Sequence, residues 1–250
     1  MLIAVGSVKG SPGVTSLALG LAVLWPQPGA VLIEADPAGG DLWARWGHHP
    51  DPGLTHFAAA ARRDFDAPII SVFRQRLRIG ADVVLAPPAD AATAPVALLA
   101  ARGLPALRQA ADNAVVVMDV GRLDPASPAL GLAAAADHVL LLVSTRLDAY
   151  AHVAARLPAL AARLPGRLWL VRTAAESTRA SGLGGLDHPV IGTLPRSRWG
   201  AGVLSGQLSV ANWRRLRLGR AIARIAARLA AQPSAARQAT SPAQQPDRPR

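Results

Sequence analysis

The sequence predicts an α/β fold, a three-layer sandwich in which a mostly parallel central sheet is flanked by helices. Short apolar segments of strand length alternate along the chain with Ala- and Leu-rich segments of helix length. The interiors of these strand segments are mostly apolar, which is typical of parallel strands that helices cover on both faces. The 250 residues are enough for one such domain with a substantial core.

The expected elements follow one another in an order that fits this fold. We expect strands over residues 2–6, 30–36, 82–86, 114–121, 138–144, 167–172 and 189–196. We expect helices over residues 17–24, 95–111, 147–164 and 213–231, and a short helix that carries Trp43 and Trp46. From Gln232 onward Pro, Ser, Gln and Ala predominate, so we expect a single domain over residues 1–231 and a disordered tail over residues 232–250.

Composition excludes several classes of function. The chain contains no Cys, which excludes thiol catalysis, disulfides and thiolate metal sites. The N-terminus enters its first strand directly, without the pattern of a secretory signal peptide, so we expect a cytoplasmic protein. The longest uncharged run, residues 10–33, is divided by Pro12, Gly13 and Pro26 into pieces too short to cross a bilayer.

The segment between the first strand and the first helix, G-S-V-K-G-S-P-G-V-T-S at residues 6–16, predicts a phosphate-binding P-loop. A strand, a glycine-bearing loop and a helix in this order direct successive backbone N–H groups and the positive helix end at an anion. The loop departs from G-x-x-x-x-G-K-[ST] where Val8 replaces the first glycine and Val14 replaces the lysine. The candidate nucleotide-binding residues are Lys9, Gly10, Ser11, Pro12, Gly13, Val14, Thr15 and Ser16.

Lys9 is the sole lysine among the 27 Lys and Arg residues of the chain. In a chain that uses arginine everywhere else, one lysine in this loop indicates a need for a compact, flexible ammonium, which a planar guanidinium does not replace. The alternative is a chance lysine in a turn.

Two carboxylates are expected beside the loop, because ligands of open parallel sheets bind at the carboxyl ends of the strands. Asp36 and Asp119 each end an apolar strand segment. Asp119 fits a Walker B carboxylate that holds a magnesium-bound water, and Gly121 permits a backbone N–H to approach a γ-phosphate. Asp36 could instead cap the turn before Pro37, and an apolar strand that ends in Asp is common without any such function.

Together these motifs resemble those of the ParA/MinD family of P-loop ATPases. The loop resembles the family's deviant motif K-G-G-x-G-K-[ST], E-A-D-P-A-G-G-D at residues 34–41 resembles D-x-D-P-Q-G-N, and V-V-V-M-D-V-G fits the family's Walker B. The resemblance spans about residues 1–231. It implies ATP and Mg²⁺ as cofactors, a homodimer that forms with nucleotide, and a role in positioning cargo, as in chromosome partitioning.

The resemblance also implies roles for individual residues. Lys9 would reach across a dimer to the partner's nucleotide, and Asp36 would position the attacking water or a magnesium-bound water. The metal-site residues would be Thr15, Asp36 and Asp119. Pro195 lies in a segment similar to the loop that flanks the adenine ring, whereas Arg172-Thr173 stands where many members have an Asn that reads adenine.

Val14 bears on two of three functional hypotheses. A loop without its lysine predicts at best a weak ATPase, since phosphoryl transfer relies on positive groups where charge develops. The first hypothesis is therefore a dimerisation switch with slow ATP turnover. The second is a scaffold or adaptor for pilus or secretion machinery that hydrolyses nothing, because degenerate loops of this kind also occur in the TadZ/CpaE-like branch.

The third hypothesis, nucleotide-independent DNA binding, follows from the uneven distribution of the net charge of +11. No acidic residue stands between Asp187 and Asp247, a stretch with nine arginines, which favours nucleic acid or an anionic membrane surface as partner. The protein would then lie peripherally on the nucleoid or on the inner membrane face. The final helix has an apolar stripe with an arginine flank, so it either packs on the sheet or forms a basic amphipathic membrane or DNA element.

Overall fold

The computed structural model describes residues 1–10, 13–63, 69–144, 146–164, 167–173 and 186–232. Within them, eight strands form one sheet in the order β3-β4-β2-β5-β1-β6-β7-β8. All neighbouring strands pair in parallel except β3 and β4, which confirms the predicted, mostly parallel α/β sandwich. The strands are β1 (Leu2–Ser7), β2 (Ala30–Glu34), β3 (Gln75–Arg76), β4 (Asp82–Val84), β5 (Val115–Arg122), β6 (His138–Ser144), β7 (Arg167–Thr173) and β8 (Val190–Leu194).

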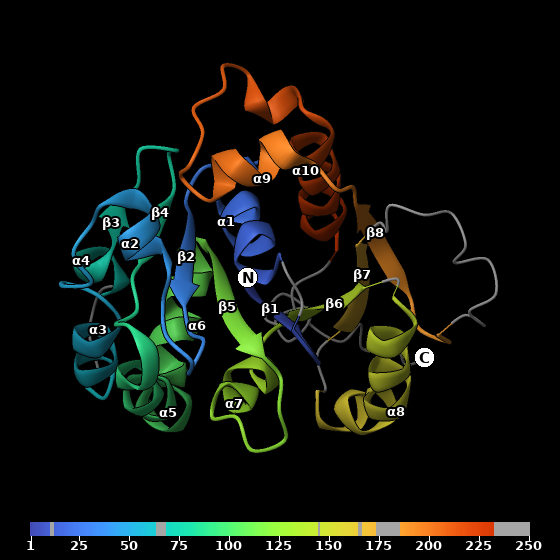
Figure 1. Ribbon diagram of the computed structural model, residues 1–250. Helices are drawn as coiled ribbons and strands as arrows, with labels where there is room; N and C mark the ends of the chain where they lie inside the picture. The colour runs from blue at the N-terminus through green and yellow to red at the C-terminus, as the bar shows by residue number, and fades with distance from the viewer. Residues whose placement is uncertain (11–12, 64–68, 145, 165–166, 174–185, 233–250) are drawn as a thin grey trace, which may run out of the picture.

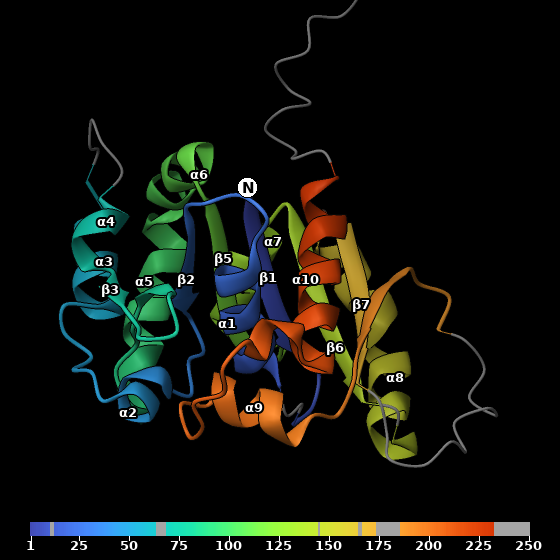
Figure 2. The same cartoon turned by 90° about the horizontal axis from the view of Figure 1, so that it is seen from above.

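Helices cover both faces of the sheet (Figures 1 and 2). Buried apolar side chains form two clusters, one beneath each helical layer. One layer contains α3 (Leu54–Ala60), α4 (Ile70–Phe73), α5 (Thr93–Arg102), α6 (Leu104–Asn113), α7 (Ala129–Ala134) and α8 (Leu147–Arg163). The other contains α1 (Val14–Leu24), α2 (Leu42–Trp46), α9 (Arg198–Leu204) and α10 (Arg217–Ala230).

β1 lies in the middle of the sheet, between β5 and β6, and all six of its residues are buried. Side chains alternate between the faces, so Leu2 and Ala4 join one apolar cluster while Ile3 and Val5 join the other. This two-sided burial explains why the segment is apolar throughout.

Three of the predicted helices are wrong in their extent, the first of which begins at Val14 rather than Leu17. The segment 95–111 is not one helix but α5 and α6, which Gly103 separates. Pro105 lies in the first turn of α6, where its missing N–H costs no helical hydrogen bond. The last helix begins at Arg217 rather than Trp213, because Leu216 is extended and the residues before it form the short 3₁₀ helix η3 (Trp213–Arg215).

The apolar stripe of α10 is part of the core. Leu218, Ile222, Ile225 and Leu229 are all buried, and a Cβ placed on Gly20 of α1 would lie 2.6 Å from Cδ1 of Ile222. The helix therefore packs closely on α1 and on the sheet, which confirms one of its two predicted arrangements and leaves no apolar face to insert into a membrane. Among the described helices, none combines the length and apolar character that a membrane span requires.

The docking of α10 can be tested by shortening Ile222. We expect Ile222→Ala to lower the free energy of unfolding by about 2–5 kcal/mol, because the side chain is fully buried and its removal leaves a cavity. Urea denaturation followed by circular dichroism measures this change. Ala227→Ser, on the exposed side of the same helix, is the control and should stay within about 0.5 kcal/mol. Equal costs for the two variants would contradict the packing of α10.

Candidate functional site

A cavity of about 500 Å³ lies at the carboxyl ends of the central strands. It is bounded by the end of β1, the start of α1 and the segments at the ends of β2 and β5, where ligands of parallel sheets bind. Its lining residues are Ser7, Gly10, Gly13, Val14, Thr15, Ser16, Asp36, Asp41, Arg45, Asp119, Gly121 and Arg122. Most of the predicted site residues are thus brought together; Ser11 and Pro12 lie outside the described residues.

The backbone of the loop leads directly into α1. Gly10 and Gly13 have φ angles of 42° and 115°, which L-residues with side chains rarely adopt. The helix begins at Val14, earlier than predicted, and the N–H of Leu17 donates to Gly13 O (2.8 Å). The amides of residues 14–16 lie ahead of this bond and have no partner within the helix, so they are available to an anion.

Val14 supplies no charge at the position where the ordinary motif has lysine. It is only 6% exposed and belongs to the apolar cluster beneath α1, although it also contributes to the cavity wall. Phosphate binding at this end of the cavity therefore depends on main-chain amides and the helix end.

Lys9 lies outside the cavity lining. Its Nζ is 2.9 Å from Nε2 of His152, on the exposed side of α8. The loop is thus linked to a helix of the opposite layer by a contact between residues far apart in the sequence, which no local pattern could have predicted.

Asp119 is fully buried within β5, next to the start of α1. It accepts a hydrogen bond from the backbone N–H of Gly121 (3.1 Å) and another from the hydroxyl of Thr15. Burial, with a smaller contribution from the nearby Asp36 and Asp41, raises the pKa of Asp119 to about 6 although both hydrogen bonds lower it.

Asp36 both caps a turn and borders the cavity. Its Oδ1 accepts from the N–H of Ala38 (2.9 Å), which confirms the turn-capping alternative, and burial raises the pKa of its carboxyl group. A Cβ on Gly121 would lie 2.0 Å from Oδ2 of Asp36, and Gly121 has a φ of 57°. Any side chain at position 121 would overlap the Asp36 carboxylate, so Asp36 can take this position only because residue 121 is a glycine.

The oxygen atoms at this site suit Mg²⁺. The hydroxyl of Thr15 and the carboxylates of Asp36 and Asp119 are the hard ligands that Mg²⁺ prefers. Over the described residues no group of three or more His, Asp or Glu side chains has metal-ligand geometry, so water and phosphate oxygens would have to complete the coordination. This is how Mg²⁺ is commonly held in nucleotide sites.

Two arginines in the cavity wall were not predicted. Arg45 forms an ion pair with Asp41 across one turn of α2, and Arg122 pairs with Asp124 (3.2 Å). The spacing of Asp41 and Arg45, four residues apart around the expected short helix, was the available sequence signal for the first pair. Both guanidinium groups bring positive charge to the cavity.

Glu34 holds the loop that carries Asp36. Its buried carboxylate accepts from the N–H groups of Asp41 and Leu42 (both 2.9 Å) and of Ala86 (3.1 Å). Burial raises its pKa to about 7 despite these three bonds. In the sequence Glu34 stood out only as a replacement for the first Asp of a motif, and its structural role was not foreseen.

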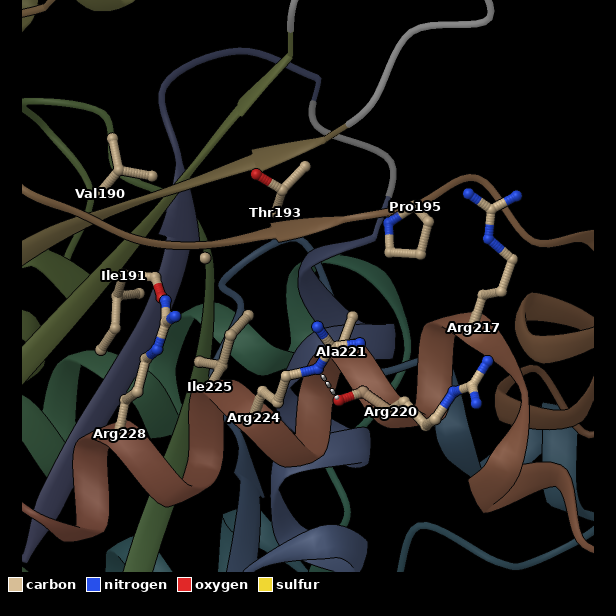
Figure 3. Close-up of a pocket in the computed structure, with 11 residues that line it drawn as sticks. Val190, Ile191, Thr193, Pro195, Arg217, Arg220, Ala221, Arg224, Ile225 and Arg228 are labelled. Atoms are coloured by element: carbon tan, nitrogen blue, oxygen red, sulfur yellow. Dashed lines mark hydrogen bonds between the residues drawn. The ribbon is translucent and has the colours of Figure 1, made fainter.

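The residues predicted near a base do not line this cavity. Pro195 borders a separate groove between β8 and α10 (Figure 3). Arg172 and Thr173 are the last two residues of β7. Their part in base recognition stays a prediction.

Comparison with solved structures identifies the fold, first as a P-loop nucleotide-binding fold and then as its ParA/MinD-like form. The ParA family ATPase from Chlorobium tepidum is 17% identical, with a TM-score of 0.68 over 91% of this chain and 98% of that one. MinD from Pyrococcus horikoshii, solved with Mg-ADP, is 13% identical, with a TM-score of 0.68 over 91% and 95%. The Cyanothece McdA(D38A)-ATP complex is 13% identical, with a TM-score of 0.66 over 93% and 97%.

No family model matches the chain, and no curated protein matches it. The structural neighbours span nearly the full length of the described chain, so the chain has the ParA/MinD-like fold. At these identities the likeness concerns the fold alone.

The raised pKa of Glu34 predicts a dependence of stability on pH. The folded form binds the proton more tightly than the unfolded form, so this group's contribution is full below about pH 4.5 and is lost as pH rises through about 7. The raised pKa of Asp119 makes stability depend on pH in the same direction. We expect Glu34→Gln to remove a slope of up to about 1.4 kcal/mol per pH unit in this window.

Urea denaturation at several pH values, without nucleotide or Mg²⁺, measures this slope. Asp112→Asn, which removes an exposed carboxylate, is the matched control and should leave the slope unchanged. Parallel pH profiles for the native protein and Glu34→Gln would show that the pKa of Glu34 is not raised.

Proposed function

We propose that this chain binds ATP with Mg²⁺ and acts as a nucleotide-dependent dimerisation switch of the ParA/MinD type, which positions cargo such as DNA, the septum or pilus machinery. The observation that carries the proposal is the convergence of the loop amides, the Thr15 hydroxyl and the carboxylates of Asp36 and Asp119 on one cavity. The shared fold with MinD and McdA, each solved with a nucleotide, supports it.

Each group would have a distinct task. The amides of residues 14–16 and the positive end of α1 would hold phosphate oxygens. Thr15 and Asp119 would hold Mg²⁺, which neutralises charge on the phosphates when bound. Asp36 would orient the attacking water through its carboxylate.

Hydrolysis would be slow, because Val14 places no charge near the transferred phosphoryl group. Arg45 and Arg122 line the cavity, but each is already paired with an aspartate.

Val14→Lys should restore the missing contact. A charge-assisted hydrogen bond contributes about 1.5–3 kcal/mol, so we expect ATP affinity to rise by roughly ten- to over a hundredfold. Fluorescence titration with a labelled ATP analogue measures the affinity, and phosphate release measures turnover. Val14→Met, of similar length without charge, is the control; an equal effect of both variants, or none, would argue against this alignment of the loop.

Lys9→Ala tests the dimer. In the proposal, Lys9 leaves His152 and reaches the nucleotide of a second subunit, so the variant should lose most nucleotide-dependent dimerisation, by about tenfold or more. Light scattering with Mg²⁺ and a non-hydrolysable ATP analogue measures the molar mass. Arg163→Ala, an exposed residue at the end of α8, is the control. An unaltered mass and affinity in Lys9→Ala would remove the role assigned to this residue.

A second candidate is a TadZ/CpaE-like scaffold, which the burial of Val14 favours. Nucleotide-dependent dimerisation without any phosphate release, even with the protein's partners present, would point to this function.

The arginine-rich stretch between Asp187 and Asp247 favours nucleotide-independent DNA binding as a third candidate. The protein would then lie in the cytoplasm or peripherally on the nucleoid or inner membrane face. A steep decrease of DNA affinity with salt, unaffected by ATP, would support it.

A further inference from the structure

A second cavity, of about 590 Å³, forms a groove between β8 and α10, on the side of the molecule away from β3 (Figures 1 and 3). Its lining includes the half-buried Ala221 and also Ile191 and Ile225, which are core residues only 3% and 1% exposed. The helix approaches the strand closely here, since a Cβ on Gly192 would lie 2.6 Å from Cγ1 of Ile225. The groove is therefore a built feature of the packing of α10 on the sheet.

β8 is the last strand of the sheet and, within the described residues, pairs only with β7. Its Val190 and Thr193 are exposed and line the groove. A strand in this position can accept a further extended segment along the edge that faces away from β7.

Four exposed arginines follow one flank of α10 at intervals of three, four and four residues: Arg217, Arg220, Arg224 and Arg228. At 1.5 Å per residue they span about 16 Å of the helix, the length of about five residues of extended chain. Arg228 donates to Ile191 O across the groove (2.6 Å), and Arg224 donates to Arg220 O (3.3 Å). Over the described part of the chain, none of the four forms an ion pair with a carboxylate.

We propose that this groove binds an acidic segment of a partner protein, extended along β8. Acidic side chains at alternate positions of the segment face α10 and pair with the arginines, while the side chains between them point to the opposite face of the sheet. The inference goes beyond the proposed nucleotide switch, because none of these residues lines the P-loop cavity.

The chemistry of the groove favours a peptide over a phosphate-rich partner. A nucleic acid backbone or a lipid headgroup layer would satisfy the arginines but would leave the edge of β8 without a partner. An acidic, β-forming peptide satisfies the guanidinium groups and the strand edge together. The chain's own C-terminal segment does not fit, since residues 233–250 carry three arginines and a single acid.

The test uses a fluorescein-labelled peptide of four Glu-Val repeats, with four Gln-Val repeats as the uncharged control, measured by fluorescence polarisation on the full chain. We expect Arg220→Glu combined with Arg224→Glu to weaken binding of the acidic peptide at least tenfold. Arg102→Glu combined with Arg163→Glu, which changes the charge equally on the opposite layer, should leave it unchanged. Circular dichroism confirms that both double variants fold.

A third peptide, N-methylated at alternate amides, tests the edge of β8 and should also bind at least tenfold more weakly, because N-methylation removes backbone donors. A 20-base-pair DNA duplex and phosphatidylglycerol vesicles are measured alongside. The proposal is overturned if either binds more tightly than the peptide and is lost in the groove variant, or if the N-methylated peptide binds equally well. It is also overturned if no peptide binds, in which case the arginines only protect the strand edge. Titration of ATP on the same samples reports separately on the nucleotide site.

Discussion

The junction between β1 and α1 is the constraint on which the site depends. β1 is fully buried at the centre of a parallel sheet and runs directly into a helix whose first amides have no helical partner. Parallel pairing then aligns its neighbours, with Asp119 opposite Val5 of β1 and opposite Glu34 of β2. The carboxylates and the free amides thus reach the same edge of the sheet because the strands run in one direction.

This arrangement has an electrostatic cost. Burial raises the pKa of Glu34, Asp36 and Asp119, so the folded protein resists full ionisation of three carboxyl groups that lie close together. Three backbone N–H donors partly offset the unfavourable burial of the Glu34 carboxylate. Asp119 has only one backbone donor and the hydroxyl of Thr15. A divalent cation beside Asp119 would favour its ionised form, and Val14 supplies no ammonium that could do so instead.

The sequence predicted what depends on local pattern. All seven predicted segments contain a strand, and those at the centre of the sheet, such as β1 and β6, are apolar over most of their length because they are buried on both faces. Gly10 and residues 13–16 were predicted from the order of strand, glycine-bearing loop and helix and from the resemblance of the loop to a known motif, and they line the cavity. Contacts between distant residues were not predictable: Lys9 meets His152, and Glu34 binds Ala86, through tertiary packing. The end of α5 at Gly103 was missed, because the helical pattern of apolar residues continues through the glycine into α6.

The position of α10 connects the two cavities physically. Its apolar stripe packs on α1, whose first turn supplies the free amides of the P-loop, and its arginine flank forms one wall of the groove beside β8. The contact between Gly20 and Ile222 leaves no room for an added Cβ, so α1 cannot move toward α10 without displacing it. The two cavities thus share one packed unit: the apolar stripe holds α10 against α1, and the arginine flank of the same helix faces the groove beside β8.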